Sequence, residues 1–273
     1  MDRVRKTYQY VTHLRRRGAI RRALRQASSN PYWNFARILD LEAKFHVKST
    51  FFFLQESKGL NPLKPAEWGR GLGRYRFNDP DVARAIKTID SAGWEVGLHG
   101  SFESFRDLRL LAREKRDLER VLGHPVAGVR QHYLNLEIPR TWEIQRQAGL
   151  SYDASLGSSV RVGYTETPWY PFEPFNDAFI VLPLAVMDGA LFASYPTLAA
   201  QTRALEKIIE EAETNHALLS VLWHQRFLNP TEFPNEYSLY EKFLGLALHR
   251  KPWIATSDQV AAWWREEFGR EAR

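Results

Sequence analysis

Residues that can do chemistry follow short apolar runs at four places in this sequence. His99 closes the run "WEVGLH", and His224 closes the run "LLSVLWH". Arg130 and His132 lie in "GVRQHY", and Asp153 lies in "YDASL". Each residue alone has a plain structural interpretation, such as a hydrogen-bonded histidine, an ordinary ion pair or a turn-forming aspartate. Their recurrence at the ends of four similar runs favours a common site.

These residue types together suit one kind of reaction. Imidazole and carboxylate groups bind zinc or another divalent first-row metal ion. A metal ion with an open coordination position polarises a carbonyl group and lowers the pKa of bound water. A histidine outside the metal site can protonate a leaving group, and an arginine beside a carboxylate base holds that base ionised. The set therefore predicts metal-assisted hydrolysis of an amide or an ester.

The elements that must position these residues alternate between helix and strand. Amphipathic helical stretches separate short apolar runs, which predicts an α/β fold with parallel strands covered on both faces. The carboxyl ends of such strands share one edge, so we expect the polar residues to meet there. The irregular stretch 157–178 is long enough to be a functional loop or lid. The predicted strands are 49–54, 94–99, 126–133, 152–156, 179–184, 218–224 and 253–257.

The sequence lacks the signatures of several other function classes. No G-x-G-x-x-G or Walker pattern follows a predicted strand, so a nucleotide-binding fold has no support. No G-x-S-x-G elbow is present, which leaves a serine hydrolase unsupported. The chain has no cysteine, which excludes disulfides, thiolate metal sites and a cysteine nucleophile.

The net charge of +6 is concentrated near the N-terminus. Residues 1–26 contain nine Lys or Arg and one acid, whereas the other 29 basic and 31 acidic residues nearly balance. Val4, Tyr8, Val11 and Leu14 recur at helical spacing, which predicts a basic amphipathic helix. This helix either docks on the core or contacts an anionic partner, such as a membrane surface or an acidic glycan. We expect no nucleic-acid partner and, without a spanning or signal segment, a cytoplasmic location.

The order of these pieces resembles the polysaccharide deacetylases of the NodB homology type, carbohydrate esterase family 4. "STFFFL" is similar to the family's second strand, and "EVGLHGS" to its metal-histidine motif. "GVRQHY" resembles the Arg-x-Pro-aromatic motif, "YDASL" the motif with a supporting aspartate, and "LLSVLWH" the last motif. The resemblance covers nearly the whole chain. It implies a deformed (β/α) barrel of about seven parallel strands, formed by residues 1–273 as one domain with the basic segment on its edge.

The resemblance assigns roles to single residues. His99 matches the first metal-binding histidine, and Arg130 matches the arginine that pairs with the catalytic base. Asp153 matches the aspartate that supports the catalytic machinery. His224 matches the general acid that protonates the leaving amine, and Leu222, two residues earlier, would line the acetyl pocket.

Two aromatic residues belong to the same motifs. The resemblance makes Tyr133 and Trp223 candidates for contact with the substrate, and the alternative for each is simple packing.

The sequence departs from the family's pattern in two ways. Glu103 stands four residues after His99, where the family has its second metal histidine; it is either a ligand or a solvated helix residue. His132 replaces the motif's proline and is an alternative ligand. Asp2 resembles the metal-binding acid of the first motif, and the first strand with its catalytic aspartate has no counterpart in the sequence. Two explanations are open: the start of the sequence is truncated or misassigned, or the protein lacks its catalytic base and the barrel is incomplete at the first strand.

The resemblance implies a metal-dependent hydrolase that removes acetyl groups from N-acetylated sugars of a polysaccharide or its precursor. The implied cofactor is a divalent metal ion, Zn²⁺ first, with Co²⁺ or Mn²⁺ as alternatives. The implied metal ligands are Asp2, His99, and Glu103 or His132. The alternative function is a non-catalytic relative that binds a glycan or another partner on the same face.

Overall fold

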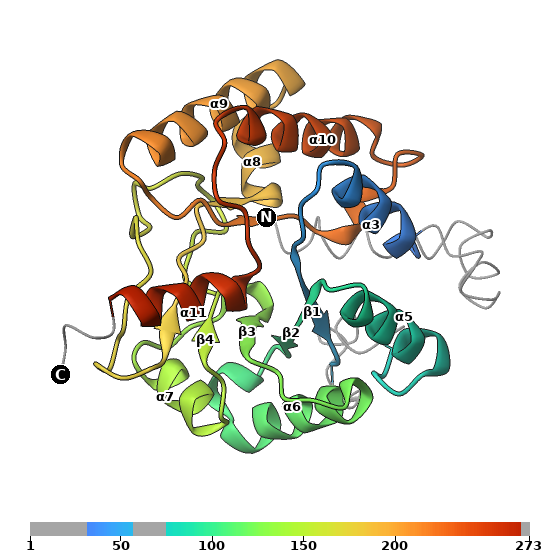
Figure 1. Ribbon diagram of the computed structural model, residues 1–273, viewed down its shortest axis with the longest axis vertical. Helices are drawn as coiled ribbons and strands as arrows, with labels where there is room; N and C mark the ends of the chain where they lie inside the picture. Colours follow the sequence, from blue (N-terminus) through green and yellow to red (C-terminus); the bar gives the residue numbers. More distant parts are fainter. Residues whose placement is uncertain (1–31, 57–74, 269–273) are drawn as a thin grey trace, which may run out of the picture.

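The computed structural model describes residues 32–56 and 75–268 (Figure 1). The predicted basic helix at 1–26, and Asp2 with it, lie outside the described residues. The described part is an α/β fold with parallel strands, as predicted. Its strands are β1 (Thr50–Leu54), β2 (Glu95–Gly100), β3 (Gly128–Gln131), β4 (Tyr152–Asp153), β5 (Ile180–Val181), β6 (Val186–Met187) and β7 (Val221–Leu222).

The strands form two sheets that one extended segment joins. Strands β1 to β5 pair in chain order, and β6 pairs with β7, every pairing being parallel. The amide of Leu184 donates to the carbonyl of Leu156 at 2.7 Å, and the amide of Val186 donates to that of Ser220 at 3.2 Å. The segment 180–187 therefore pairs with β4 in its first half and with β7 in its second. All seven strands consequently point their carboxyl ends to the same edge.

The helices pack around these strands in two groups (Figure 1). Helices α5, α6 and α7 lie together around β1 to β4, and α9 and α10 lie side by side at the other end. The helices are α3 (Phe35–Lys44), α5 (Pro80–Ser91), α6 (Leu108–Leu122), α7 (Arg140–Gln147), α8 (Asp188–Ser194), α9 (Leu198–Thr214), α10 (Pro234–His249) and α11 (Ser257–Glu267).

Helix α6 shows how the sequence sets such boundaries. The carboxylate of Asp107 accepts a hydrogen bond from the amide of Leu110 at 3.0 Å, which caps the first turn. Gly123 ends the helix with a φ of 89°, a left-handed conformation that glycine adopts without steric cost.

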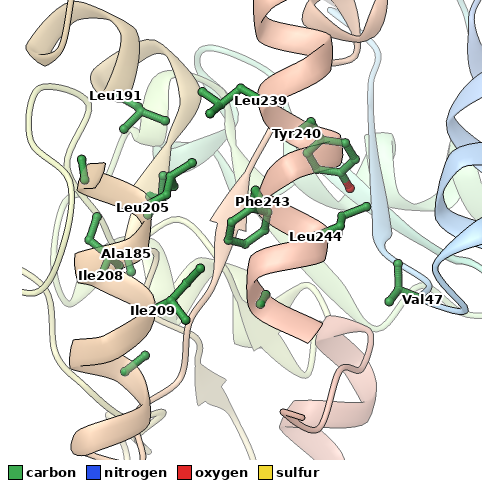
Figure 2. Packing of buried hydrophobic residues seen from close by; sticks show 14 of the residues in the cluster. Val47, Ala185, Leu191, Leu205, Ile208, Ile209, Leu239, Tyr240, Phe243 and Leu244 are labelled. Atoms are coloured by element: carbon green, nitrogen blue, oxygen red, sulfur yellow. The ribbon is translucent and has the colours of Figure 1, made fainter. Parts of the chain in front are cut away.

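The apolar core of the described residues consists of a small cluster around Tyr152 and Ala261 and of two large ones, which belong to the two groups of helices. One cluster is built from β1, β2 and their flanking helices, and includes Ile86, Leu98 and Leu111. The other lies where α9 and α10 face each other across Leu205, Ile209 and Phe243 (Figure 2). Side chains of β6 and β7 pack in or against the second cluster, which therefore supports the strand that precedes His224.

Helix α11 closes the amino end of the strands. The amide of Ser257 donates to Oγ1 of Thr50 at 2.8 Å, and the amide of Asp258 donates to Oε2 of Glu95 at 2.9 Å. Thr50 and Glu95 are the first residues of β1 and β2. The polar edge at the carboxyl ends is therefore opposite this helix.

The predicted strand at 253–257 is wrong. Residues 251–256 form no strand, and Thr256 starts α11 with a capping box that includes Gln259. Trp253 and Ile254, which supplied the apolar signal, are exposed side chains. Their hydrophobicity marks a surface feature and not a buried strand.

The stretch 157–178 is irregular, as predicted, with single bridges at Gly157 and Phe172. Tyr164 stacks on Trp169 with ring centroids 4.3 Å apart, and its hydroxyl donates to the carbonyl of Leu218 at 3.0 Å. This part of the stretch is packed onto the strand region before β7. Within residues 32–56 and 75–268, no helix is both long enough and apolar enough to cross a bilayer.

Candidate functional site

His99 lies near the carboxyl end of β2, between β1 and β3. In the sheet register, Leu54, His99 and Arg130 are neighbours. The Nδ1 atom of His99 lies 2.6 Å from the carbonyl oxygen of Arg130. A carbonyl only accepts, so Nδ1 carries the proton and the lone pair of the ring is on Nε2. This is the tautomer in which a histidine can bind a metal ion through Nε2.

Arg130 is buried at the end of β3. Its Nε donates to the carbonyl of Ala154 at 2.8 Å, and its guanidinium lies 4.6 Å from the ring centroid of Phe52. Burial lowers the pKa of Arg130 to about 10. Among the described residues, Arg130 forms no ion pair with a carboxylate. Its predicted pairing with a catalytic base remains a prediction.

Asp153 is fully buried beside β3 and acts on that strand through Ser155. Its carboxylate accepts hydrogen bonds from Gln145 Nε2 at 2.8 Å and from Ser155 Oγ at 2.6 Å. Ser155 Oγ in turn accepts the amide of Gln131 at 2.8 Å. Burial raises the pKa of Asp153 above its ordinary value. Asp153 thus fixes the end of β3, next to Arg130.

A carboxylate that the sequence analysis did not select holds His224. Asp188 begins α8 directly after β6, and His224 follows β7, the partner strand of β6. The Nδ1 atom of His224 lies 2.7 Å from Oδ1 of Asp188, and the backbone amide of His224 also donates to that carboxylate. The Asp188 side chain is 0% exposed, whereas that of His224 is 46% exposed. A buried carboxylate therefore fixes an accessible imidazole at this edge.

His132 lies beside a second carboxylate that was not predicted. Glu56 follows β1, and its side chain is 2% exposed. Its Oε2 accepts the amide of Phe102 at 3.2 Å and lies 3.9 Å from Nδ1 of His132. The rings of His132 and His99 lie edge to face with centroids 5.3 Å apart. The His132 ring thus lies between the Glu56 carboxylate on one side and the His99 ring on the other, at the ends of β1, β2 and β3.

The candidate substrate-contacting residues differ in exposure. Tyr133 is 59% exposed, has a left-handed backbone with a φ of 61°, and packs on the edge of Phe102 with centroids 5.7 Å apart. Trp223 is partly buried and packs against the second core cluster, with the ring centroids of Phe192 and Tyr240 5.5 and 5.2 Å away. Tyr133 is open to a ligand, whereas the contacts of Trp223 are those of a packing residue.

The other two predicted residues among those described are Leu222 and Glu103. Leu222 ends β7 in register with Met187, and His224 follows it by two residues, after the strand has ended. Glu103 precedes a short 3₁₀ turn, Ser104–Arg106, and its carboxylate accepts from Nε of Arg106 at 3.0 Å. Part of the Glu103 carboxylate is therefore occupied by a guanidinium.

The described donors do not by themselves make a metal centre. In residues 32–56 and 75–268, no three His, Asp or Glu side chains gather so that they could hold an ion. The tautomer of His99 suits a metal ligand. Asp2 lies outside the described residues, so the predicted ligand set stays a prediction.

The two missed carboxylates had weak sequence signals. Asp188 follows the long apolar run "FIVLPLAVM", and Glu56 follows "STFFFLQ" by one position. Both obey the rule that selected the other residues, namely a polar side chain just after an apolar strand. Asp188 was missed because the predicted strand ended at residue 184, before β6.

Comparison with known proteins shows the fold. No family model and no curated protein matches the sequence. The chain is similar to the solved structure of Puue allantoinase, with 19% identity, a TM-score of 0.61, and coverage of 90% of this chain and 78% of that one.

Two solved polysaccharide deacetylases are equally similar. A putative polysaccharide deacetylase from Mycobacterium smegmatis has 19% identity and a TM-score of 0.60, covering 87% of this chain and 78% of its own. A probable polysaccharide deacetylase from Pseudomonas aeruginosa PAO1 has 17% identity and a TM-score of 0.60, covering 90% and 79%. The predicted NodB-type deacetylase fold is thereby confirmed, and identities this low carry the comparison no further than the fold.

Proposed function

We propose that this chain, which has the polysaccharide deacetylase fold, is a hydrolase that removes acetyl groups from N-acetylated sugars of a polysaccharide or its precursor. The shared fold supports the class of reaction. The observation that carries the proposal is the pair of Asp188 and His224: a fully buried carboxylate holds a half-exposed imidazole at the carboxyl edge of the strands. That is the arrangement of a positioned general acid.

His224 supplies a proton to the departing amine. An amide nitrogen leaves readily only after it has been protonated, so its hydrolysis needs an acid at that atom. Asp188 accepts the hydrogen bond from Nδ1 of His224, which turns Nε2 away from the carboxylate. In its doubly protonated form, which carries one proton on Nδ1 and one on Nε2, His224 gives the Nε2 proton to the leaving nitrogen as the C–N bond breaks. Water supplies the oxygen added to the acetyl group, and the products are acetate and a free amino sugar.

The neighbouring residues position the substrate. Leu222 lines the pocket for the acetyl methyl group, and Tyr133 offers an exposed ring to the sugar. Arg130 is held at the same edge by Ala154 and Phe52, and we assign it an orienting role toward the reacting groups. Asp153 acts indirectly, by fixing the end of β3 through Ser155.

The proposal includes a divalent metal ion, most simply zinc. When bound, such an ion supplies an activated water and polarises the acetyl carbonyl. His99 would bind it through Nε2, with His132 or Glu103 as a further candidate ligand. Because the described donors fall short of a site, the metal requirement depends on a donor such as Asp2.

Acetate release tests the proposed activity. Chitin oligomers and a generic acetyl ester are offered to chelator-treated protein, with and without added Zn²⁺ or Co²⁺. We expect acetate from the wild type and a loss of about 10²–10⁴-fold in His224→Gln. His249→Gln, at the exposed end of α10, is the matched control and should keep full activity. Equal rates for His224→Gln and the wild type would contradict the proposal.

The second candidate function is a glycan-binding protein without turnover. The ion pair of Glu103 with Arg106 favours it, because this carboxylate stands where the family has its second metal histidine. Calorimetry with the same oligomers separates the two candidates, because the binding protein would bind sugar but release no acetate under any metal condition.

A further inference from the structure

Aromatic side chains gather on the outer surface of the C-terminal region. Trp253, Trp263 and Phe268 are 60%, 41% and 47% exposed, and Ile254 beside them is 38% exposed. The ring centroids of Trp253 and Trp263 are 5.6 Å apart, and those of Trp263 and Phe268 are 5.7 Å apart. The three rings thus form a row, which we call the aromatic row. A contiguous apolar surface of this kind marks an interaction site.

The charges at the two ends of the aromatic row have opposite signs. Lys251 lies two residues before Trp253, whereas Glu266 and Glu267 directly precede Phe268. All three are exposed, and none forms an ion pair with another described residue. The nearby Arg250 differs, because its guanidinium already pairs with Glu213 at 3.0 Å. The aromatic row therefore has one positive and one negative end.

This charge pattern discriminates between possible partners. A bilayer with acidic headgroups would attract Lys251 but repel the two glutamates. A sugar ring needs a flat aromatic platform, and the planes of neighbouring rings in the row are inclined at 60° and 80°. A second copy of the chain offers a charge of opposite sign to each end of the aromatic row. A two-fold axis through Trp263 would place Lys251 of each protomer against the glutamates of the other.

We infer that the aromatic row is the contact surface of a symmetric homodimer. The rings form its apolar centre, and Lys251 with Glu266 and Glu267 forms its complementary rim. Helix α11 contacts the amino ends of β1 and β2 through Thr50 and Glu95. The dimer contact therefore lies at the opposite end of the strands from His99 and His224. Dimer formation leaves the candidate site open, and it does not depend on the proposed activity.

The oligomeric state of the full chain tests this inference. We expect a dimer in sedimentation velocity that dissociates on dilution. Trp263→Ser should raise its dissociation constant by at least about thirtyfold, because a buried tryptophan at the centre of an interface is a typical hot spot. Val160→Ser, which removes a 69% exposed apolar side chain elsewhere, is the matched control and should leave the dimer intact.

Charge reversal tests the symmetry. Lys251→Glu alone and the double variant Glu266→Lys/Glu267→Lys should each weaken self-association by roughly tenfold. A mixture of the two variants should form dimers again, since every rim contact in the mixed dimer joins opposite charges. A wild type that is monomeric at all concentrations would overturn the inference, as would a dimer insensitive to Trp263→Ser or a mixture that stays monomeric. A monomer that binds acidic lipid vesicles through these rings would assign the row to a membrane instead.

Discussion

At each end of the parallel strands a carboxylate is held by hydrogen bonds, and the two carboxylates differ in their partners. At the amino end, Glu95 accepts hydrogen bonds from Thr50 Oγ1 at 2.6 Å, Tyr152 Oη at 2.5 Å and the amide of Asp258 at 2.9 Å. At the carboxyl end, Asp188 holds the imidazole of His224. Tyr152 is fully buried, whereas half of the His224 side chain is open.

This difference separates a structural carboxylate from a functional one. The donors to Glu95 belong to β1, β4 and α11, so they tie the strands to the helix that covers them. A methyl group added at Gly128 would collide with the ring of Tyr152, which shows how tightly this end is filled. Asp188 instead accepts a hydrogen bond from the ring of His224, and this ring is still accessible to a ligand. A carboxylate held by several hydrogen bonds therefore does not by itself indicate function, and the accessible ring of His224 is what distinguishes Asp188 from Glu95.

The largest effect is expected at the carboxyl end. Asp188→Asn replaces a carboxylate, which only accepts hydrogen bonds, by an amide, which can also donate. The amide can therefore donate to Nδ1 of His224 and select the other tautomer of the ring. We expect acetate release to fall by about 10²–10⁴-fold while the protein stays folded. Glu95→Gln is the control, and its activity should match the wild type. Wild-type activity in Asp188→Asn would contradict the claim that Asp188 is functional whereas Glu95 is structural.

At the amino end, the expected effect is on stability. Glu95→Ala leaves the buried hydroxyl of Tyr152 and the amide of Asp258 without their acceptor. We expect the free energy of unfolding in urea to fall by about 2–4 kcal/mol, with the rate of acetate release per folded molecule unchanged. A loss of activity in excess of the loss of folded protein would show that this end takes part in catalysis.

The pH dependence of stability gives a smaller effect. Burial raises the pKa of Asp153 above its ordinary value of 3.8 in the folded state. The folded state then binds more protons than the unfolded state between these two pKa values, so the stabilising contribution of this carboxyl group is present below 3.8 and is lost as the pH rises through the folded pKa.

Asp153→Asn isolates this contribution, because the amide does not titrate. We expect the free energy of unfolding of the wild type, minus that of the variant, to grow as the pH falls from 7 toward 4. Urea unfolding at several pH values measures it. A difference that shrinks with falling pH would mean that hydrogen bonds to Ser155 and Gln145 outweigh burial.

The smallest effect is expected at Glu103. Its carboxylate is engaged by Arg106 in a surface ion pair, so Glu103→Gln should change the free energy of unfolding by under about 1 kcal/mol. We expect metal-stimulated acetate release to change little in Glu103→Gln and to fall more strongly in His132→Gln. The opposite order would identify Glu103, and not His132, as the ligand beside His99.

Most of the fold could be predicted from the sequence, because most of its strands are short apolar runs that stand out from the segments around them. Runs such as "TFFFL" and "EVGLHG" are apolar, short and bounded by helices, so β1 and β2 were predicted nearly to the residue. The segment 180–187 was predicted only in its first half. It changes pairing partners at Leu184, from β4 to β7, and this long-range choice leaves no local signal.

The residues of the candidate site that follow a strand could be predicted from the sequence. The contacts that arise only because two particular strands are neighbours in the sheet could not. His99, Arg130 and His224 follow from the rule that parallel strands share a polar edge. The contact of Asp188 with His224 spans 36 residues and exists only because β6 and β7 are neighbours. Trp253 and Ile254 gave the opposite error, a strand predicted where there is none, because hydrophobicity alone does not distinguish an exposed apolar surface from a strand.

A double-mutant cycle on Asp188 and His224 tests the account most directly. Acetate release is measured for the wild type, Asp188→Asn, His224→Gln and the double variant under one set of metal conditions. If Asp188 acts only by orienting His224, the double variant is no slower than His224→Gln alone. If the two losses multiply, Asp188 acts independently of the histidine and the proposed acid pair is contradicted.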